Sequence, residues 1–425
     1  MNDETPEKTI HKNDALFVCH RIPYPPNKGD KIRSWQILNW LSTKFNVHLA
    51  AFVDDPDDFQ HEYVLSQVAA SVKLVPLDPL TSKIKSASGF LRGEPLSISF
   101  YRDRRMADAV AEIRQHPIQL EMAFSSTMAQ YIKTPSSQKS VRIIDFCDAD
   151  SEKWSAYAQQ KRWPLSFVYR REGALLQEAE LEIANWADHS FAISPQEAIV
   201  LGRGVVDFDW FANGVDTEYF SMDATIDQRA AAGATPSDVI FTGAMDYWAN
   251  IDAVLWFVEG VWPIVKAQAP GATFSIVGAK PDPRILALDG HNGVSVVGSV
   301  PDMRPWLANA KIAVAPMRIA RGVQNKVLEA MAMSRPVVLT PNAAAGIDAQ
   351  DGEAVLVRSD IIGFADTIVG LLLDDGYRQN LGSRARKCVA NKYQWSVCFK
   401  RLEAAVSDTI ARHLSEISTA HPSDR

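Results

Sequence analysis

Short runs of apolar and β-branched residues alternate with longer amphipathic stretches along most of the chain. In the first half, strand-like and helix-like segments follow one another at residues 16–19, 34–42, 47–53, 72–76, 104–114, 120–124, 141–146, 169–188 and 190–193. Such an alternation predicts parallel strands joined by crossover helices.

A second series of the same kind begins after residue 238. Its strand-like and helix-like segments lie at residues 239–241, 251–266, 273–277, 294–297, 312–315, 323–333 and 337–339, and helices at 364–373, 376–389 and 395–413 end it. Residues 221–238, rich in Ala, Asp and Thr, separate the two series and are typical of a linker or of a frayed helix between domains. The pattern therefore predicts two Rossmann-like α/β domains, with ligands at the carboxyl ends of the strands, facing a central cleft.

Composition narrows the class of protein. The 425 residues carry 44 Lys and Arg against 51 Asp and Glu, a net charge of −7, which argues against a general nucleic-acid binder. The four cysteines have no metal-ligand spacing and are expected to be reduced thiols. The polar start lacks a signal core, and no apolar run reaches the ~20 residues of a membrane span. We expect a cytoplasmic protein that at most associates with the inner face of a membrane.

The second domain contains a candidate phosphate site in the segment 315–332, where a strand, a short loop and a helix follow one another. A helix N-terminus suits a phosphate, and Arg321 and Lys326 add positive charge near it, beside Gly322. Glu329 can accept hydrogen bonds from the two vicinal hydroxyls of a ribose. An exposed Lys326–Glu329 pair with no binding role is the alternative.

Two glycine turns of the same domain support this interpretation. Gly243 stands at the tip of the first strand, where the backbone can approach a diphosphate, and residues 298–302 follow another strand and can contact a flat base. There is no GxGxxG motif, which argues against a dinucleotide oxidoreductase.

In the first domain, the segment PYPPNKGDKIRS leaves the first strand at residues 23–34. Gly29 allows the backbone to come close to a ligand, and the helix that follows directs its N–H groups toward an anion. Lys28 and Arg33 are the cations expected to face that ligand, with Asp30 between them. A solvated charged loop is the alternative.

Acidic residues follow a later strand of the first domain, in DFCDADSEKW. Asp148 and Asp150 can hold acceptor hydroxyls, and one of them can help to deprotonate the attacking oxygen. Three nearby carboxylates also suit a divalent metal ion. Helix capping by Asp150 or Ser151 is the structural alternative.

Longer motifs resemble a known family. The segments FTGAMDYWANIDAVLWF, FSIVGAKP, VVGSVPDMRPWLANAKIAVAPM and GVQNKVLEAMAMSRPVVLT are similar to the carboxy-terminal domain of retaining GT-B glycosyltransferases of family 4, and ISPQEA and NGVDTEYF to its interdomain passage. The opening LFVCHRIPYPPNKGDKIRSWQIL, with IDFCDADSEKW, resembles the sugar transferases of exosortase (PEP-CTERM) exopolysaccharide systems. The resemblance covers roughly residues 14–412.

The resemblance implies a domain plan and a reaction. It implies an acceptor-side domain at 14–215, a nucleotide-sugar domain at 216–394, and a terminal helix at 395–413 that crosses back to the first domain. The reaction is transfer of a sugar, with retention and without metal or cofactor, from a nucleotide diphosphate donor to a saccharide or lipid-linked acceptor in exopolysaccharide biosynthesis. A GT-B nucleotide-sugar epimerase and a catalytically silent GT-B binding subunit are the alternatives.

The resemblance also assigns residues. Glu329 matches the second glutamate of the E-x7-E element, which binds the donor ribose, whereas the first glutamate is replaced by Arg321. The usual basic pair after the domain's first strand is replaced by residues that include Met245 and Asn250. Our hypothesis is that Arg321 and Lys326 hold the diphosphate instead, with Arg321 contributing to catalysis.

Overall fold

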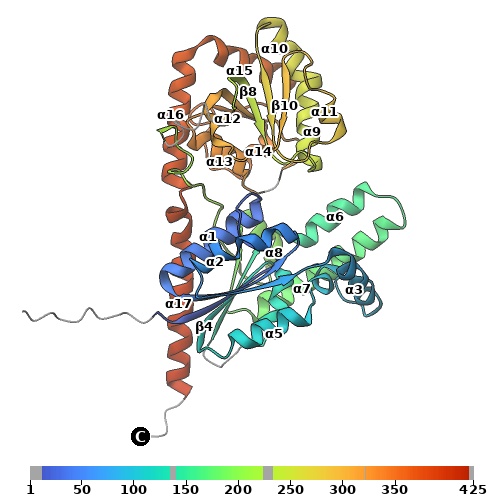
Figure 1. Ribbon diagram of the computed structural model, residues 1–425, viewed down its shortest axis with the longest axis vertical. Coiled ribbons are helices and arrows are strands. Elements are labelled where there is room, and N and C mark those ends of the chain that lie inside the picture. The colour runs from blue at the N-terminus through green and yellow to red at the C-terminus, as the bar shows by residue number, and fades with distance from the viewer. Residues whose placement is uncertain (1–11, 135–139, 224–232, 321, 421–425) are drawn as a thin grey trace, which may run out of the picture. The chain divides into compact units, whose positions relative to one another are not determined.

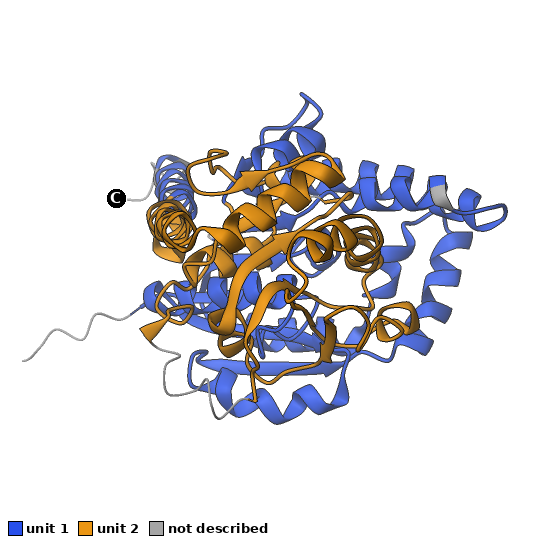
Figure 2. Cartoon of the chain, turned by 90° about the horizontal axis from the view of Figure 1, so that it is seen from above, with its two compact units in different colours: residues 1–211, 401–425 blue, residues 212–400 orange. Residues whose placement is uncertain are grey.

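The computed structural model describes residues 12–134, 140–223, 233–320 and 322–420 (Figure 1). The chain divides into two compact units, coloured separately in Figure 2. Unit 1 extends to Phe211 and includes the chain from Arg401 onward, and unit 2 is Ala212–Lys400. Each unit is a Rossmann-like α/β domain built on a parallel sheet, as the sequence pattern predicts.

Unit 1 is built on a seven-stranded sheet of order β3-β2-β1-β4-β5-β6-β7. Its strands are β1 (Asp14–Cys19), β2 (Asn46–Val53), β3 (Ser71–Pro76), β4 (Ile118–Phe124), β5 (Val141–Cys147), β6 (His189–Ala192) and β7 (Asp209–Trp210). Its helices are α1 (Gly29–Lys44), α2 (Glu62–Ser66), α3 (Pro79–Leu91), α4 (Leu96–Phe100), α5 (Arg104–Ile113), α6 (Asp150–Gln160), α7 (Leu165–Trp186) and α8 (Pro195–Gly202).

The central strands of unit 1 are buried at nearly every position, which explains why they read as continuous apolar runs rather than as alternating ones. A parallel sheet covered by helices on both faces requires this pattern. Helix α1 begins at Gly29, five residues before the start that the sequence pattern predicts. Lys31 and Arg33 therefore belong to its first turns and are buried.

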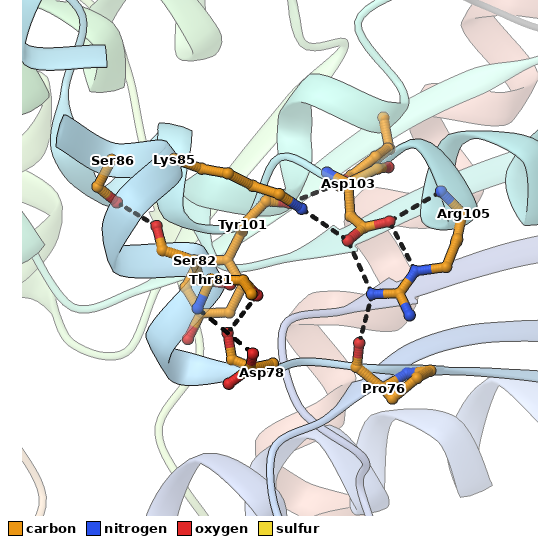
Figure 3. A network of polar contacts seen from close by, with 10 residues as sticks. Pro76, Asp78, Thr81, Ser82, Lys85, Ser86, Tyr101, Asp103 and Arg105 are labelled. Atoms are coloured by element: carbon orange, nitrogen blue, oxygen red, sulfur yellow. Dashed lines mark hydrogen bonds and ion pairs between the residues drawn. The ribbon is translucent and has the colours of Figure 1, made fainter. Parts of the chain in front are cut away.

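A polar network joins β3, α3 and α5 around the carboxylate of Asp103 (Figure 3). Asp103 caps α5 by accepting a hydrogen bond from the Arg105 amide, and it also accepts hydrogen bonds from the side chains of Arg105 and Lys85. The Arg105 guanidinium reaches on to the Pro76 carbonyl at 2.8 Å. The hydrogen bonds from Arg105 hold the pKa of Asp103 well below its usual range. The network fixes the segment that carries Tyr101.

Unit 2 is built on a six-stranded sheet of order β10-β9-β8-β11-β12-β13. Its strands are β8 (Ser237–Thr242), β9 (Phe274–Val277), β10 (Val294–Gly298), β11 (Ala310–Ala315), β12 (Val337–Leu339) and β13 (Leu356–Val357). Its helices are α9 (Trp248–Trp256), α10 (Trp262–Gln268), α11 (Pro283–Leu286), α12 (Arg304–Asn309), α13 (Asn325–Ala332), α14 (Pro341–Ala344), α15 (Ile361–Leu373) and α16 (Asp375–Lys392).

Two segments of the second half differ from the sequence pattern. The single helix predicted at 251–266 is α9 and α10 joined by a π-helical segment, Phe257–Val261. The predicted linker at 221–238 lies partly outside the described residues. The last helix, α17 (Trp395–Ala420), begins in unit 2 and continues in unit 1, where Arg401 lies over the ring of Trp210.

None of the helices in the described ranges combines the length and the apolar character that crossing a bilayer requires.

Candidate functional site

Three glycines end adjacent strands at the carboxyl edge of the sheet in unit 2. The Gly243 amide donates to the Val277 carbonyl at 3.1 Å, and the Gly278 amide donates to the Gly298 carbonyl at 2.8 Å. A Cβ atom at Gly278 would lie 1.7 Å from the Gly243 oxygen, so only glycine fits there. The backbones of adjacent strands are therefore packed closely at this edge, which leaves no room for a side chain at Gly278.

Lys326 directs its ammonium group into this edge. Its Nζ donates to Oδ1 of Asn250 at 2.6 Å and lies 4.3 Å from the centre of the Phe241 ring. The Asn250 amide in turn donates to the Ala244 carbonyl at 2.8 Å. A Cβ atom at Gly243 would lie 3.0 Å from Lys326 Nζ. The structure thus brings together Gly243 and Lys326, which are far apart in the sequence.

Lys326 and Glu329 are half-buried, and burial works against both charges. Burial lowers the pKa of Lys326 to about 7, although the attraction of Glu329 opposes this shift. Burial likewise raises the pKa of Glu329 to about 7, against the attraction of Lys326. An anion bound beside Lys326 would favour its charged form and raise its pKa.

Helix α13 begins directly before Lys326. Its N-cap residue, Gln324, makes no side-chain capping hydrogen bond, so the first turn keeps the positive end of the helix dipole. Gly322 precedes it with a φ of 59°, and a Cβ atom at Gly346 would lie 2.2 Å from the Gly322 oxygen. Arg321 lies outside the described residues, so its role remains a prediction.

An aromatic group that the sequence reasoning overlooked lies in the same unit. The guanidinium of Arg304 stacks 3.7 Å from the centre of the Tyr219 ring, and it forms an ion pair of 2.6 Å with Asp302. Burial, followed by the charge of Asp302, raises the pKa of Tyr219, and Glu329 contributes in the same direction. Glu329 therefore lies within electrostatic range of the tyrosine. Tyr219 belongs to the segment NGVDTEYF, which resembles the interdomain passage of the family but from which no site residue was predicted.

In unit 1, a charged cluster lies where β1 and β2 end. The Asp30 carboxylate pairs with the Arg21 guanidinium and lies 3.3 Å from Nε2 of His20, while Arg21 also binds Asp54 at 3.0 Å. Burial opposes ionisation of Asp30, but the hydrogen bond from His20 and the charges of His20 and Arg21 hold its pKa well below the usual range. Asp30 is thus a fixed anion, and its partners were not predicted.

The other predicted residues of the opening segment lie elsewhere. Lys28 and Gly29 are exposed at the start of α1.

Arg33 corrects the sequence prediction, because it does not face a ligand. Its side chain is fully buried, with two hydrogen bonds to Asp145 at 2.7 and 3.1 Å and a third to the Phe211 carbonyl at 3.0 Å. Because α1 begins at Gly29, Arg33 lies on the side of the helix that faces the core of unit 1. There its guanidinium pairs with the buried carboxylate of Asp145.

Asp148 and Asp150 lie together and share a cation. Both carboxylates are 2.9 Å from Nζ of Lys153, whose pKa is raised: burial opposes the shift, and the charges of Asp150 and Asp148 outweigh it. Among the described residues, these aspartates belong to no group with metal-ligand geometry. The capping alternative is not observed either: α6 has no side-chain cap, and the Ser151 hydroxyl donates to Glu180 at 2.6 Å.

Tyr101 connects the two acidic groups of unit 1. Burial raises the pKa of its phenol to about 12, and the charge of Arg21 opposes this while Asp54, Asp150 and Asp30 reinforce it. His20, whose ring centre is 5.9 Å from that of Tyr101, completes the group. The carboxyl edge of this sheet therefore carries carboxylates held by cations around a neutral phenol.

Residues 236–374 match the family described as "Glycosyl transferases group 1". The match covers the sheet of unit 2 and the residues from Gly243 to Glu329. No curated protein sequence matches the chain.

Solved structures match nearly the whole chain. HepE from Anabaena in complex with UDP is 14% identical and superimposes with a TM-score of 0.64, over 93% of this chain and 100% of HepE. Its complex with UDP-glucose gives a TM-score of 0.63 at 14% identity, over 93% of this chain and 99% of that one. Sucrose-phosphate synthase from Thermosynechococcus elongatus is 17% identical, with a TM-score of 0.67 over 95% of this chain and 100% of the synthase. The chain has the GT-B fold.

Proposed function

We propose that this protein is a glycosyltransferase that moves a sugar from a nucleoside diphosphate donor to a saccharide or lipid-linked acceptor. One observation carries the proposal: the ammonium of Lys326 lies beside Gly243 at the strand ends of unit 2, next to the uncapped start of α13. The glycosyl transferases group 1 match over residues 236–374 supports it, as do the UDP and UDP-glucose complexes of HepE.

In this proposal the diphosphate lies over Gly243, between Lys326 and the first turn of α13. The positive charge and the free N–H groups stabilise the diphosphate as it leaves with the electrons of the sugar–oxygen bond. Glu329 accepts hydrogen bonds from the ribose hydroxyls. Our hypothesis is that Arg321, which precedes Gly322 in the sequence, adds a second cation for the leaving group.

The acceptor role falls to unit 1. Asp148 and Asp150 hold acceptor hydroxyls, while Lys153 forms an ion pair with each carboxylate. One of them can take the proton of the attacking hydroxyl. In this arrangement Lys326 and the dipole of α13 supply the positive charge that a metal ion would otherwise supply, so we propose transfer without a metal ion. Following the family resemblance, we also propose that transfer proceeds with retention and serves exopolysaccharide biosynthesis.

Peripheral membrane association fits one surface of unit 1. Helices α6 and α7 form a helical hairpin (Figure 1). Trp163 in its turn is 81% exposed, and Leu165 and Phe167 are also exposed, close in sequence to the exposed Lys161 and Arg162. Aromatic and cationic side chains together suit an anionic lipid surface. Co-sedimentation with vesicles that contain anionic lipid should fall for Trp163→Ser, and equal binding by the variant would contradict this role.

The direct test of the proposed function measures donor binding and turnover with a panel of nucleotide sugars. The native protein should show a rise in Tm with its donor and should release nucleotide when an acceptor is present. Lys326→Gln should lose both signals, whereas Lys387→Gln, which changes an exposed lysine of the same unit, should keep them.

The same assay separates the two alternatives. A binding subunit, which the replacement of the first glutamate by Arg321 favours, would bind the donor without turnover. An epimerase would convert the donor without an acceptor. Absence of donor binding in the native protein would refute the proposal itself.

A further inference from the structure

A second cluster of chemically active side chains lies at the amino edge of the sheet in unit 1, at the other end of the strands from the acidic groups described above. Asp14 is the first residue of β1, His48 lies near the start of β2, and His116 comes two residues before β4. Strand β1 pairs with both β2 and β4, with Leu16 opposite His48 and Asp14 opposite Ile118. The topology therefore brings the three side chains together at the start of three neighbouring strands.

The potential ligand atoms of these residues converge. One carboxylate oxygen of Asp14 and one ring nitrogen of each histidine all lie within 4.8 Å of one another. Oδ1 of Asp14 is 3.8 Å from Nε2 of His48. The rings of His48 and His116 are stacked, with their centres 4.3 Å apart and an interplanar angle of 26°.

His48 has a feature that ordinary side-chain packing rarely leaves, a buried ring nitrogen without a hydrogen-bond partner among the described residues. It is 5% exposed, and its Nδ1 lies 2.8 Å from the Ser71 hydroxyl oxygen. Its Nε2 is buried and has no hydrogen-bond partner among the described residues. Buried polar atoms are nearly always satisfied, so an unpartnered ring nitrogen aimed at a carboxylate indicates that a cation belongs between them.

The surroundings are those of a metal ligand. When Nδ1–H donates to Ser71, the lone pair of Nε2 is free to bind a metal, and a second hydrogen bond of this kind fixes the orientation of ligating histidines. The Asp14 carboxylate is also held in place, because its Oδ1 accepts a hydrogen bond from the side-chain amide of Asn46 at 3.2 Å.

We propose that Asp14, His48 and His116 bind a divalent transition-metal ion, with Zn²⁺ as the best-suited ion. Two imidazole nitrogens and one carboxylate oxygen are ligands that Zn²⁺ accepts, and a water molecule can take the fourth tetrahedral position. Bonds of about 2.0–2.1 Å place tetrahedral ligands about 3.3 Å apart. Because the nitrogen lone pairs lie in the ring planes, the exposed His116 ring has to turn out of its stack on His48 to bind the same ion.

The site lies at the start of the strands, whereas the acidic groups of unit 1 follow their ends. Its effect is therefore on stability rather than on transfer. Because the ligands come from three segments that are separated in the unfolded chain, a bound ion stabilises the native state.

Zinc titration of the full chain, after removal of metals with a chelator, tests the proposal by calorimetry and by Tm. We expect one ion per chain and a Tm that rises with ZnCl2. His116→Ala and Asp14→Asn should each weaken binding by about tenfold or more. His291→Ala, which removes an exposed histidine of unit 2, should bind as the native protein does.

Co²⁺ provides a spectroscopic check of the ligands. The Co²⁺-loaded protein should show visible d–d bands with the intensity typical of a tetrahedral site, and no thiolate charge-transfer band. His116→Ala should lose the d–d bands. Absence of binding, unchanged affinity in both ligand variants, or a thiolate band would each overturn the proposal. None of these readouts depends on sugar transfer.

Discussion

Nζ of Lys326 donates a hydrogen bond to Oδ1 of Asn250 over 2.6 Å. This contact places a lysine of α13 against a residue of α9, where the amide oxygen is a neutral partner. Asn250 occupies one of the positions at which the family resemblance leads us to expect a basic pair. The Asn250 amide therefore positions the cation of Lys326 and does not itself supply the charge of the expected basic pair.

Donor binding should take up protons near pH 7. Burial lowers the pKa of free Lys326 to about 7, so a large fraction is neutral there, and a bound diphosphate raises that pKa. Above pH 7 the affinity should fall by up to about tenfold per pH unit, because the ammonium form becomes scarce. Calorimetry in buffers of different ionisation enthalpy measures the uptake.

Controls for proton uptake separate the two members of the coupled pair. Glu329→Gln removes the titration of the carboxyl group, and uptake that persists in this variant belongs to Lys326. Because Lys326→Gln is expected to lose donor binding, Glu329→Gln is the variant that decides. Loss of the uptake in Glu329→Gln would contradict the assignment to Lys326.

Gly243→Ala should impair donor binding through Lys326. The new Cβ would lie 2.8 Å from Nδ2 of Asn250 and 3.0 Å from Nζ of Lys326, at a φ of 148° that side chains rarely adopt. We expect donor KM to rise by about tenfold, the equivalent of about 1.4 kcal/mol. Gly271→Ala is the matched control, because nothing lies within 4 Å of its added Cβ. Equal KM values for both variants would refute the close approach.

Glu329→Gln should weaken recognition of the ribose and leave recognition of the phosphates intact. A hydrogen bond to a charged group contributes about 1.5–3 kcal/mol, so the affinity for the nucleoside diphosphate should fall by about tenfold to a hundredfold. A 2′,3′-dideoxy donor lacks both hydroxyls, and the native protein and the variant should bind it equally. A loss of the same size with both donors would show that Glu329 acts in another way.

The sequence predicts the parts of this fold that depend on continuous apolar runs. Most strands of both sheets follow from burial on two faces, although the short edge strands β7 and β13 were not predicted. The approach of Gly243 to Lys326 follows from parallel topology, since strand ends share one edge. Helix α6 was not predicted, because its sequence DSEKWSAYAQQ lacks a clear apolar stripe.

Side-chain partners were harder to predict than elements. Arg33 and Lys28 look equivalent in the sequence, and only the start of α1 at Gly29 determines that Arg33 points into the core. Lys153 likewise reads as an ordinary surface lysine until the turn after β5 places both Asp148 and Asp150 against it. Such pairs depend on the rotation of a helix by a fraction of a turn, which no apolar pattern fixes.

Arg33→Met should destabilise the protein strongly while leaving donor recognition by unit 2 unchanged. The guanidinium and the Asp145 carboxylate are both fully buried, and the variant leaves that carboxylate without its charged partner. Breaking a buried pair in this way costs about 3–5 kcal/mol. Urea denaturation measures the loss, and a loss below about 1 kcal/mol would contradict the buried pairing of Arg33 with Asp145.

Two further variants show whether the lost stability comes from the unpaired charge. Arg33→Met combined with Asp145→Asn removes the orphaned carboxylate and should be less destabilised than the single variant. Lys73→Met breaks the exposed pair with Glu112 and should cost less than about 1 kcal/mol, since solvent screens that pair. If the double variant is no more stable than Arg33→Met, the loss arises instead from the hydrogen bond to Phe211 and the contact with its ring, which the guanidinium approaches to 3.7 Å.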